Sequence, residues 1–391
     1  MPRRTLWQVP TLHTEGDRGE HRKVTWLELF FDLFFVVGVS QLSYPLLGPV
    51  EPSRLPTYAL LFIPLWWTWI SFTVYQERFE TEGLDQRLFT FLFMAPVAGM
   101  SVFARNALGD GASGFAGSYL LGRLLIVFLW GRAALHNPRF RRVGWIYVSG
   151  FSLSALCFLL SFAASGPSRY TLWAAGLAAD LATPWLTIKD QAKLPRFATS
   201  KLIERYGLFV IIVLGEVVVG LVTGLSQNHD GTAASLGLAA LGLAVGFGLW
   251  WIYFDYIARR PPVRHFHITI LWSYLHMPLV LALAATGPAL VSVVTGTGAF
   301  WLLPSAVGAA LFIMGLMELT LHRDASEPTH PWLSPLVKWV SSAGLFAWIA
   351  VPNPPAIATL GATLAALAAP MAYGAWVWFR QDLAVTAEVR E

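Results

Sequence analysis

The side chains of this chain that could carry chemistry are acids set inside long apolar runs. Asp32 lies in the run 30–37, and Glu216 lies in the run 211–220, where no neighbour within a helical turn could neutralise it. A charge at membrane depth costs about 2.5–3.5 kcal/mol, so an acid retained there is a candidate for binding an ion, a proton or a polar solute. A carboxyl group in such a site can exchange a proton near neutral pH.

Two further acids stand near the starts of the helices predicted to carry Asp32 and Glu216. Glu28 precedes Asp32 by four residues, so both lie on one helical face. Thr25 and Glu28 have the spacing of a capping box, so Glu28 is interpreted as a helix-start residue or as a binding residue. Glu204 stands beside Arg205, where local pairing is the ordinary explanation.

Three more ionisable residues are candidates for the same site. Asp180 lies nine residues before Lys189 and just before Thr183-Pro184, where a proline frees a backbone carbonyl that could join a polar site. Arg123, deep in another apolar run, is the predicted cation partner of a buried acid. His276 is a lone intramembrane histidine, and such a residue is more often a satisfied core side chain than a ligand.

Arg132 and Glu318 are interpreted differently, because they fall near the ends of their apolar runs. Long side chains at such positions reach toward the polar interface. We therefore expect both residues to have structural roles.

Other site chemistries lack support in the sequence. The single Cys157 cannot form an intramolecular disulfide, and the histidines have no third ligand at zinc-binding spacing. Phosphate-loop, metalloprotease and serine-hydrolase motifs are missing from the sequence. We expect no catalytic residue, no metal and no cofactor, and hence no enzyme.

The elements that carry these residues are predicted to be transmembrane helices. The chain has 391 residues, of which 55% are hydrophobic and only 13% charged, about half the charge of an average soluble domain. Its apolar runs are about twenty residues long, the length of a helix that crosses a bilayer. The basic residues lie at helix ends and form no continuous face, so nucleic acid is not an expected partner. The sequence thus predicts an all-α polytopic membrane protein that contacts membrane lipids.

We predict about twelve spans, at 26–47, 55–75, 88–108, 117–135, 143–163, 170–188, 202–225, 234–257, 267–294, 299–320, 334–351 and 355–379. Basic residues gather on one side of these spans, among them Arg22, Lys23, Arg139, Arg141, Arg142, Lys189, Arg196, Arg259, Arg260 and Arg264. The other side offers only Arg54, Arg105 and Arg169. The positive-inside rule therefore places both termini in the cytoplasm, in a multi-pass protein of the cell membrane.

The two halves of the chain resemble each other. Leu65-Trp66-Trp67 recurs at 249–251, and other short matches keep nearly the same shift. Six spans per half would give a parallel repeat, as in many transporters. The predicted parts are a cytoplasmic segment 1–25, a first repeat 26–188, a connector 189–201, a second repeat 202–379 and a cytoplasmic tail 380–391. Asp32 matches Glu216 under one shift, whereas Glu28 matches Glu204 under another.

Two motifs resemble the bacterial low temperature requirement protein A family (LtrA). One is Trp26-Leu-Glu28-Leu-Phe-Phe-Asp32-Leu-Phe-Phe-Val-Val-Gly-Val-Ser-Gln41 after Arg22-Lys23, and the other is Glu204-Arg205-Tyr-Gly-Leu-Phe-Val-Ile-Ile-Val-Leu-Gly215-Glu216. Tyr206 stands where the family pattern suggests phenylalanine. The family name implies a role in growth in the cold and brings no settled substrate.

The leading hypothesis is a secondary transporter or permease, with Asp32 and Glu216 facing one interior cavity between the halves. Neutralising either acid should relieve a desolvation cost and leave folding largely intact, yet abolish activity. Two alternatives stay open: a non-transporting membrane sensor or assembly protein needed in the cold, and an intramembrane enzyme that modifies lipids.

Overall fold

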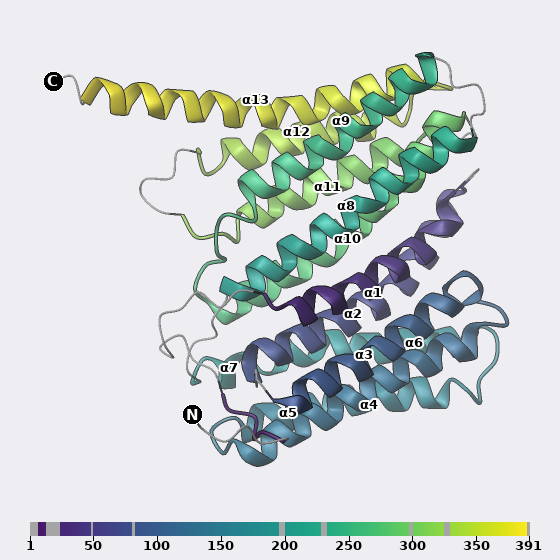
Figure 1. Cartoon of the computed structure of the whole chain (residues 1–391), viewed down its shortest axis with the longest axis vertical. Helices are drawn as coiled ribbons and strands as arrows, with labels where there is room; N and C mark the ends of the chain where they lie inside the picture. Colours follow the sequence, from purple (N-terminus) through teal and green to yellow (C-terminus); the bar gives the residue numbers. More distant parts are fainter. Residues whose placement is uncertain are drawn as a thin grey trace. The chain divides into compact units, whose positions relative to one another are not determined.

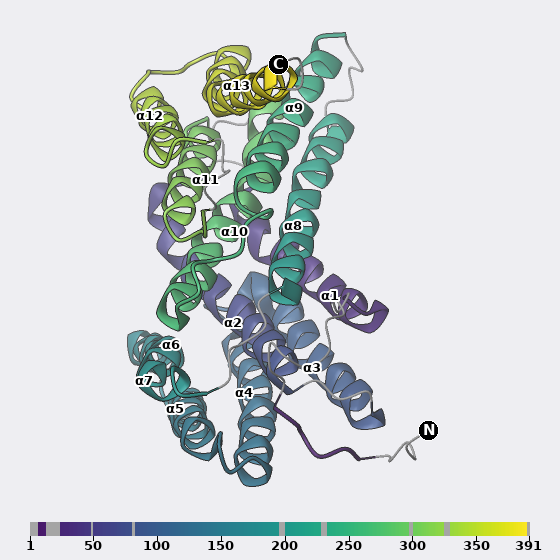
Figure 2. The same ribbon diagram turned by 90° about the vertical axis from the view of Figure 1, so that its left-hand side faces the viewer.

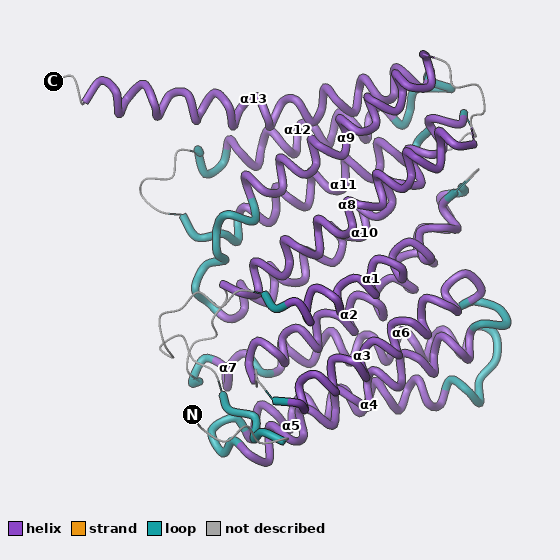
Figure 3. Tube along the Cα trace, viewed as in Figure 1, coloured by secondary structure: helices purple, strands orange, loops and turns teal. Residues whose placement is uncertain are grey.

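The computed structural model describes residues 7–12, 24–47, 50–79, 83–194, 200–227, 233–296, 300–323 and 329–388. Within these ranges the regular elements are helices, apart from an isolated bridge between Pro262 and Leu321 (Figure 3). The long helices are α1 (Trp26–Ser43), α2 (Leu55–Phe79), α3 (Leu84–Phe103), α4 (Ala112–His136), α5 (Arg141–Leu160), α6 (Pro167–Leu186), α8 (Ser200–Gln227), α9 (Ala233–Tyr256), α10 (Phe266–Thr295), α11 (Leu302–Glu318), α12 (Leu333–Trp348) and α13 (Ala356–Glu388) (Figure 1). The short ones are η1 (Tyr44–Leu46), η2 (Pro52–Arg54), η3 (Ala104–Asn106) and α7 (Ile188–Gln191).

Every predicted span overlaps one of the long helices. Of the described helices, nine segments are long and apolar enough to cross a membrane: Trp26–Leu46, Pro52–Phe79, Leu84–Asn106, Ala112–His136, Arg141–Leu160, Lys201–Ser226, Ser235–Tyr256, Phe266–Thr295 and Ala356–Arg380. A polytopic helical membrane protein is therefore confirmed, because helices satisfy their backbone groups internally in lipid. The count of twelve spans stays a prediction. Arg22, Lys23 and Arg196 lie outside the described residues, as do parts of the predicted terminal segments and of the connector 189–201.

Contacts divide the chain into two compact units. Unit 1 comprises Met1–Leu42 and Ser53–Tyr206, and unit 2 comprises Ser43–Pro52 and Gly207–Glu391. The first residues of α8 thus belong to unit 1 and the rest of that helix to unit 2. The predicted connector 189–201 ends a few residues before this boundary.

Unit 1 is built around α2 and α4. Helix α4 packs against α3 and α5, α5 packs against α6, and α2 contacts α3, α4 and α6 (Figure 2). Large rings fill the interior, and Trp66, Trp69, Trp130 and Trp173 are among the largest fully buried side chains. Because α2 is covered on several sides, polar residues on different faces of it can meet charged partners from several helices.

Unit 2 repeats this order of contacts. Helix α11 packs against α10 and α12, α12 packs against α13, and α9 contacts α10, α11 and α13. With α8 to α13 taken as counterparts of α1 to α6, each contact named for unit 1 has an equivalent in unit 2. An additional contact joins α11 and α13.

Two glycines bring α8 and α10 into close contact inside unit 2. A Cβ added to Gly220 would overlap the backbone of Gly287, and one added to Gly287 would overlap the backbone carbonyl of Glu216. Small residues at such a crossing let two membrane helices approach closely. The turn of α8 that carries Glu216 is held against α10 in this way.

Candidate functional site

The start of α1 forms the predicted capping box. The Thr25 backbone N–H donates to Glu28 Oε2 at 2.8 Å, and the Glu28 backbone N–H donates to Thr25 Oγ1 at 3.3 Å. This arrangement satisfies backbone donors at the helix start, as expected. Glu28 is also buried and forms an ion pair with Lys201, at 2.9 Å between Nζ and Oε1. The helix-start interpretation is therefore confirmed, but it describes only one of the roles of Glu28.

One turn further along α1, Asp32 is fully buried and bound to the first turns of α8 and to α2. Arg205 Nη2 donates to Asp32 Oδ1 at 3.0 Å, and Trp69 Nε1 donates to the same oxygen at 2.8 Å. Among the described residues, the second oxygen, Oδ2, has no hydrogen-bond donor. Asp32 thus keeps a buried acceptor atom beside its counter-ion.

Arg205 links the acids of α1 into one network. Its Nη1 lies 3.9 Å from Glu28 Oε1 and donates to Gln76 Oε1 at 2.9 Å. Together with Lys201, the network holds two carboxylates and two cations, all of them buried. We call these four residues (Glu28, Asp32, Lys201 and Arg205) the α1–α8 charge network. Its formal charges cancel, which is the condition for keeping ions out of water.

Glu204 points away from this network. Its side chain is exposed, whereas the adjacent Arg205 is fully buried. Consecutive residues of a helix do not face the same way, so the two side chains have different surroundings. In the described part of the chain, Arg205 pairs with the acids of α1, and the expected local pairing with Glu204 is wrong.

A second buried ion pair joins α4, α5 and α6. Asp180 Oδ1 lies 3.6 Å from Arg123 Nη1, and both side chains are fully buried. Tyr119 donates a hydrogen bond to Asp180 Oδ2, and Ser154 donates to the same oxygen at 2.6 Å. The prediction that Arg123 pairs with a buried acid is confirmed. With three helices meeting at one carboxylate, Asp180 has the surroundings of a structural cross-link.

Arg123 is held on its other side by α2. Its Nη2 donates to Ser71 Oγ at 2.9 Å, and its guanidinium lies 4.8 Å from the Tyr119 ring centroid. A guanidinium over an aromatic face gains further electrostatic attraction. The Arg123–Asp180 pair is therefore enclosed by side chains of unit 1.

The two remaining candidates lie in unit 2. Glu216 is buried next to the crossing of α8 and α10, and its expected convergence with Asp32 on one cavity stays a prediction. His276 is fully buried, with Nδ1 2.9 Å from the Trp272 carbonyl oxygen and Nε2 3.0 Å from Tyr253 Oη. A carbonyl can only accept, so Nδ1 carries the proton and Nε2 accepts from the tyrosine in the neutral ring. The interpretation of His276 as a satisfied core histidine is confirmed.

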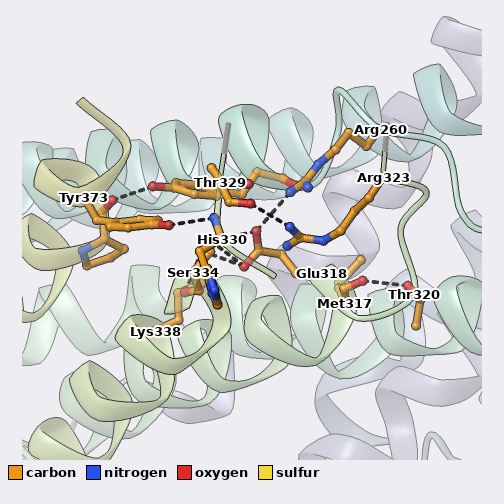
Figure 4. Close-up of polar contacts among 12 residues, drawn as sticks. Arg260, Met317, Glu318, Thr320, Arg323, Thr329, His330, Ser334, Lys338 and Tyr373 are labelled. Carbon is orange, nitrogen blue, oxygen red and sulfur yellow. Dashed lines mark hydrogen bonds and ion pairs between the residues drawn. The ribbon is translucent and has the colours of Figure 1, made fainter. Parts of the chain in front are cut away.

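A third cluster, which was not predicted from the sequence, is centred on Glu318 at the end of α11 (Figure 4). Arg260 Nη2 and Lys338 Nζ each lie 3.0 Å from a Glu318 oxygen, and Ser334 Oγ lies 2.9 Å from both oxygens. Glu318 is 1% exposed, so the expected reach to the interface is wrong for this residue. An isolated antiparallel bridge pairs Leu321, just after α11, with Pro262 in the connection between α9 and α10.

The signal for this cluster was present in the sequence. Lys338 is the single Lys or Arg residue of α12, and it lies well inside that helix. The reasoning that selected Arg123 applies equally to Lys338. Arg132 is also buried, and it pairs with Asp85 at 2.9 Å, so the expected reach to the interface is wrong for this residue too.

Metal ligands do not gather anywhere in the described part of the chain. No group of three or more His, Cys, Asp or Glu side chains among those residues could hold an ion. The arrangement is one of carboxylates paired with Arg and Lys on packed helices.

Membrane-spanning helices with buried ion pairs define the class of this chain as a polytopic helical membrane protein. It belongs to the family described as Bacterial low temperature requirement A protein (LtrA), which it matches over residues 23–378. It is also similar to the Rhizobium meliloti (strain 1021) protein named "Uncharacterized protein RA0937", with 28% identity over 295 residues, which are 68% of this chain and 69% of the relative. The predicted family is thereby confirmed.

Proposed function

We propose that this LtrA family protein is a secondary transporter or permease whose intramembrane carboxylates bind an ion, a proton or a polar solute. One observation carries the proposal. Asp32 is fully buried and paired with Arg205, yet its Oδ2 has no hydrogen-bond donor among the described residues. A buried acceptor of this kind is costly unless something binds to it.

The α1–α8 charge network supplies a means of coupling. Arg205 lies 3.0 Å from Asp32 and 3.9 Å from Glu28, so it has two carboxylates within reach. A proton that binds Asp32 Oδ2 removes the charge of that carboxylate and leaves Glu28 as the stronger partner of Arg205. Two alternative pairings of one cation make a two-state element that a proton or a bound solute can bias.

The second acid pair has a different role in this proposal. Asp180 Oδ2 accepts hydrogen bonds from Tyr119 and Ser154. Its Oδ1 also lacks a hydrogen-bond donor among the described residues, but that oxygen faces the guanidinium of Arg123 at 3.6 Å. We assign Asp180 to helix packing and assign transport to Asp32, with Glu216 as its counterpart in the second repeat. The buried Ser154 and Tyr119 are fixed by this carboxylate, so we propose no enzymatic activity for them.

We also propose the finer architecture: twelve spans in two parallel six-helix repeats, 26–188 and 202–379, with both termini in the cytoplasm of a cell-membrane protein. The matching order of helix contacts in units 1 and 2 supports the repeat. Cysteine labelling tests the orientation in a Cys157→Ala background. Cysteines at Arg141 and Arg259 should be protected in intact cells, and one at Asp110 should be labelled; the opposite pattern would reverse the orientation.

Flux and cold growth test the transport proposal. Full-length wild type, Asp32→Asn and Asp180→Asn are reconstituted at matched folded abundance, and uptake of labelled amino acids, sugars and inorganic ions is measured with a lumenal pH dye. The same variants are tested for rescue of low-temperature growth in a strain that lacks the protein. We expect Asp32→Asn to abolish uptake and rescue, and Asp180→Asn to retain both per folded molecule.

The outcome also separates the alternatives. Wild-type uptake and rescue from Asp32→Asn would refute the transport site and support a sensor or assembly role, in which the acids only join helices. Turnover of a phospholipid by the wild type, lost in the Asp180→Asn variant, would instead support the lipid-modifying enzyme.

A further inference from the structure

A small cavity lies inside unit 1, where α2 and α4 end and α3 begins. Its volume is about 20 Å³, which is enough for about one water molecule. Its wall includes Gln76, Asp85, Leu129 and Arg132, and all four side chains are buried. Because three of them are polar, the cavity can hold solvent inside the helix bundle.

Gln76 connects this cavity to the α1–α8 charge network. Its Oε1 accepts a hydrogen bond from Arg205 Nη1 at 2.9 Å, and Arg205 Nη2 donates to Asp32 Oδ1 at 3.0 Å. The Gln76 Nε2 donates to Thr90 Oγ1 at 3.2 Å, which fixes the orientation of the amide. One side chain therefore separates the cavity from the buried Arg205–Asp32 pair. Solvent admitted to the cavity would act on that pair through a single hydrogen-bonded residue.

Residues 7–12 lie over the cavity, and we call them the N-terminal strap. Pro10 is buried and belongs to the cavity wall. Two side chains at the end of α4 hold the backbone of the strap. Arg132 Nη2 donates to the Gln8 carbonyl oxygen, and Asn137 Nδ2 donates to the Pro10 carbonyl oxygen at 2.7 Å. Arg132 thus belongs both to the wall of the cavity and to the anchorage of the strap.

Trp7 forms a further anchor. Its ring meets Phe89 edge-on, with the ring centroids 5.9 Å apart, and the Arg132 guanidinium lies 4.4 Å from the Trp7 ring centroid. A guanidinium over an indole face is attracted by the ring electrons. Gly83 leaves room for the next residue of the strap, because a Cβ added there would lie 3.2 Å from Gln8 Cγ. The surface of unit 1 is therefore shaped to receive the strap.

The strap is nevertheless attached to unit 1 through side chains. Residues 7–12 form no helix or strand, and none of the backbone-to-backbone hydrogen bonds between described residues involves them. The Trp7 and Val9 side chains are 51% and 53% exposed. A segment with few buried contacts and no backbone ladder is among the parts of a protein that open first.

We infer that the N-terminal strap is a removable cover that controls the access of water to the α1–α8 charge network. With the strap in place, Pro10 helps to close the cavity. Release of the strap opens the cavity to solvent and exposes Gln76, and through Gln76 the charge of Arg205. The inference concerns access alone, so it holds whether or not Asp32 carries transport.

Cysteine modification of the detergent-solubilised full-length protein tests this inference in a Cys157→Ala background. The reporter is Leu129→Cys, because Leu129 belongs to the cavity wall and is 1% exposed. The control reporter is Ile126→Cys, which is about one turn earlier on α4, equally buried and outside the cavity wall. A small water-soluble methanethiosulfonate is the probe, and mass spectrometry of the intact protein measures the rate of modification.

Two variants of the strap are compared. Trp7→Ala removes an anchor and should raise the rate at Leu129→Cys about tenfold, because the strap then opens more often. Val9→Ala changes a similarly exposed neighbour outside the cavity wall and should leave the rate unchanged. Ile126→Cys should react equally slowly in both variants and with the wild-type strap. No solute flux enters this test, so its outcome is independent of the uptake experiment.

Three results would overturn the inference. The first is an equal rate at Leu129→Cys in Trp7→Ala and Val9→Ala. The second is the same acceleration at Ile126→Cys, which would mean a general loosening of unit 1. The third is modification of Leu129→Cys with the wild-type strap as fast as that of a cysteine at the exposed Asp110.

Discussion

The α1–α8 charge network predicts a strong energetic coupling between Asp32 and Arg205. Their atoms lie 3.0 Å apart, and both side chains are fully buried. At an effective dielectric constant of about 20, two unit charges at this distance attract each other by about 5–6 kcal/mol. Desolvation of both ions opposes this attraction, and removing one partner of a buried pair costs about 3–5 kcal/mol. We therefore expect Asp32→Asn and Arg205→Gln each to lower the free energy of unfolding by about 3 kcal/mol.

The double variant Asp32→Asn/Arg205→Gln distinguishes a charge effect from a packing effect. It restores neutrality, because Glu28 and Lys201 remain paired at 2.9 Å. The double variant should lose less free energy of unfolding than the sum of the two single losses, by about 2 kcal/mol. This difference is the coupling energy, and it lies in the upper part of the range measured for contacting residues. Tryptophan fluorescence during unfolding in mixed detergent and sodium dodecyl sulfate measures the three values. Additive losses would refute the network as an electrostatic unit.

Two further predictions follow from contacts in each unit. Asp180→Asn should lower the free energy of unfolding by about 3 kcal/mol, because it leaves Arg123 without its carboxylate. Asp190→Asn should change the free energy of unfolding by less than about 1 kcal/mol, because its cation partners Arg142 and Lys193 are largely exposed to solvent. Equal effects of the two variants on the midpoint of thermal unfolding would contradict the assignment of Asp180 to helix packing. Gly287→Val should lower the free energy of unfolding by about 1–3 kcal/mol, because the added side chain forces α8 and α10 apart. Gly215→Ala should not lower it, because a Cβ added there meets nothing within 4 Å. A Gly287→Val variant as stable as the wild type would show that the helix crossing adjusts easily.

The helices were predictable because each depends on a local property. A run of about twenty apolar residues can satisfy its backbone in lipid only as a helix, and the Thr25–Glu28 spacing marks where α1 begins. His276 could be interpreted correctly for a similar reason, since the carbonyl one turn back, on Trp272, is supplied by its own helix.

The partners of the buried acids were less accessible to sequence reasoning. The sequence places Asp32 in a site or a buried polar network but does not name its counter-ion, which is Arg205. The two residues are far apart in sequence, and Glu204 offered Arg205 a nearer partner. Lys338 was overlooked although its apolar surroundings resemble those of Arg123. Pairing between distant helices depends on packing, which no local pattern encodes.

Because Lys338 is fully buried, chemical modification of its side chain can report when the helices of unit 2 separate. Its ammonium lies 3.5 Å from the centroid of the Tyr256 ring and 3.0 Å from Glu318, which leaves no approach for a reagent. Lys189 and Lys193 are exposed. An amine-reactive reagent therefore modifies those two at once but acylates Lys338 only after α12 has separated from its neighbours. The rate of that slow acylation measures how often unit 2 opens in a membrane.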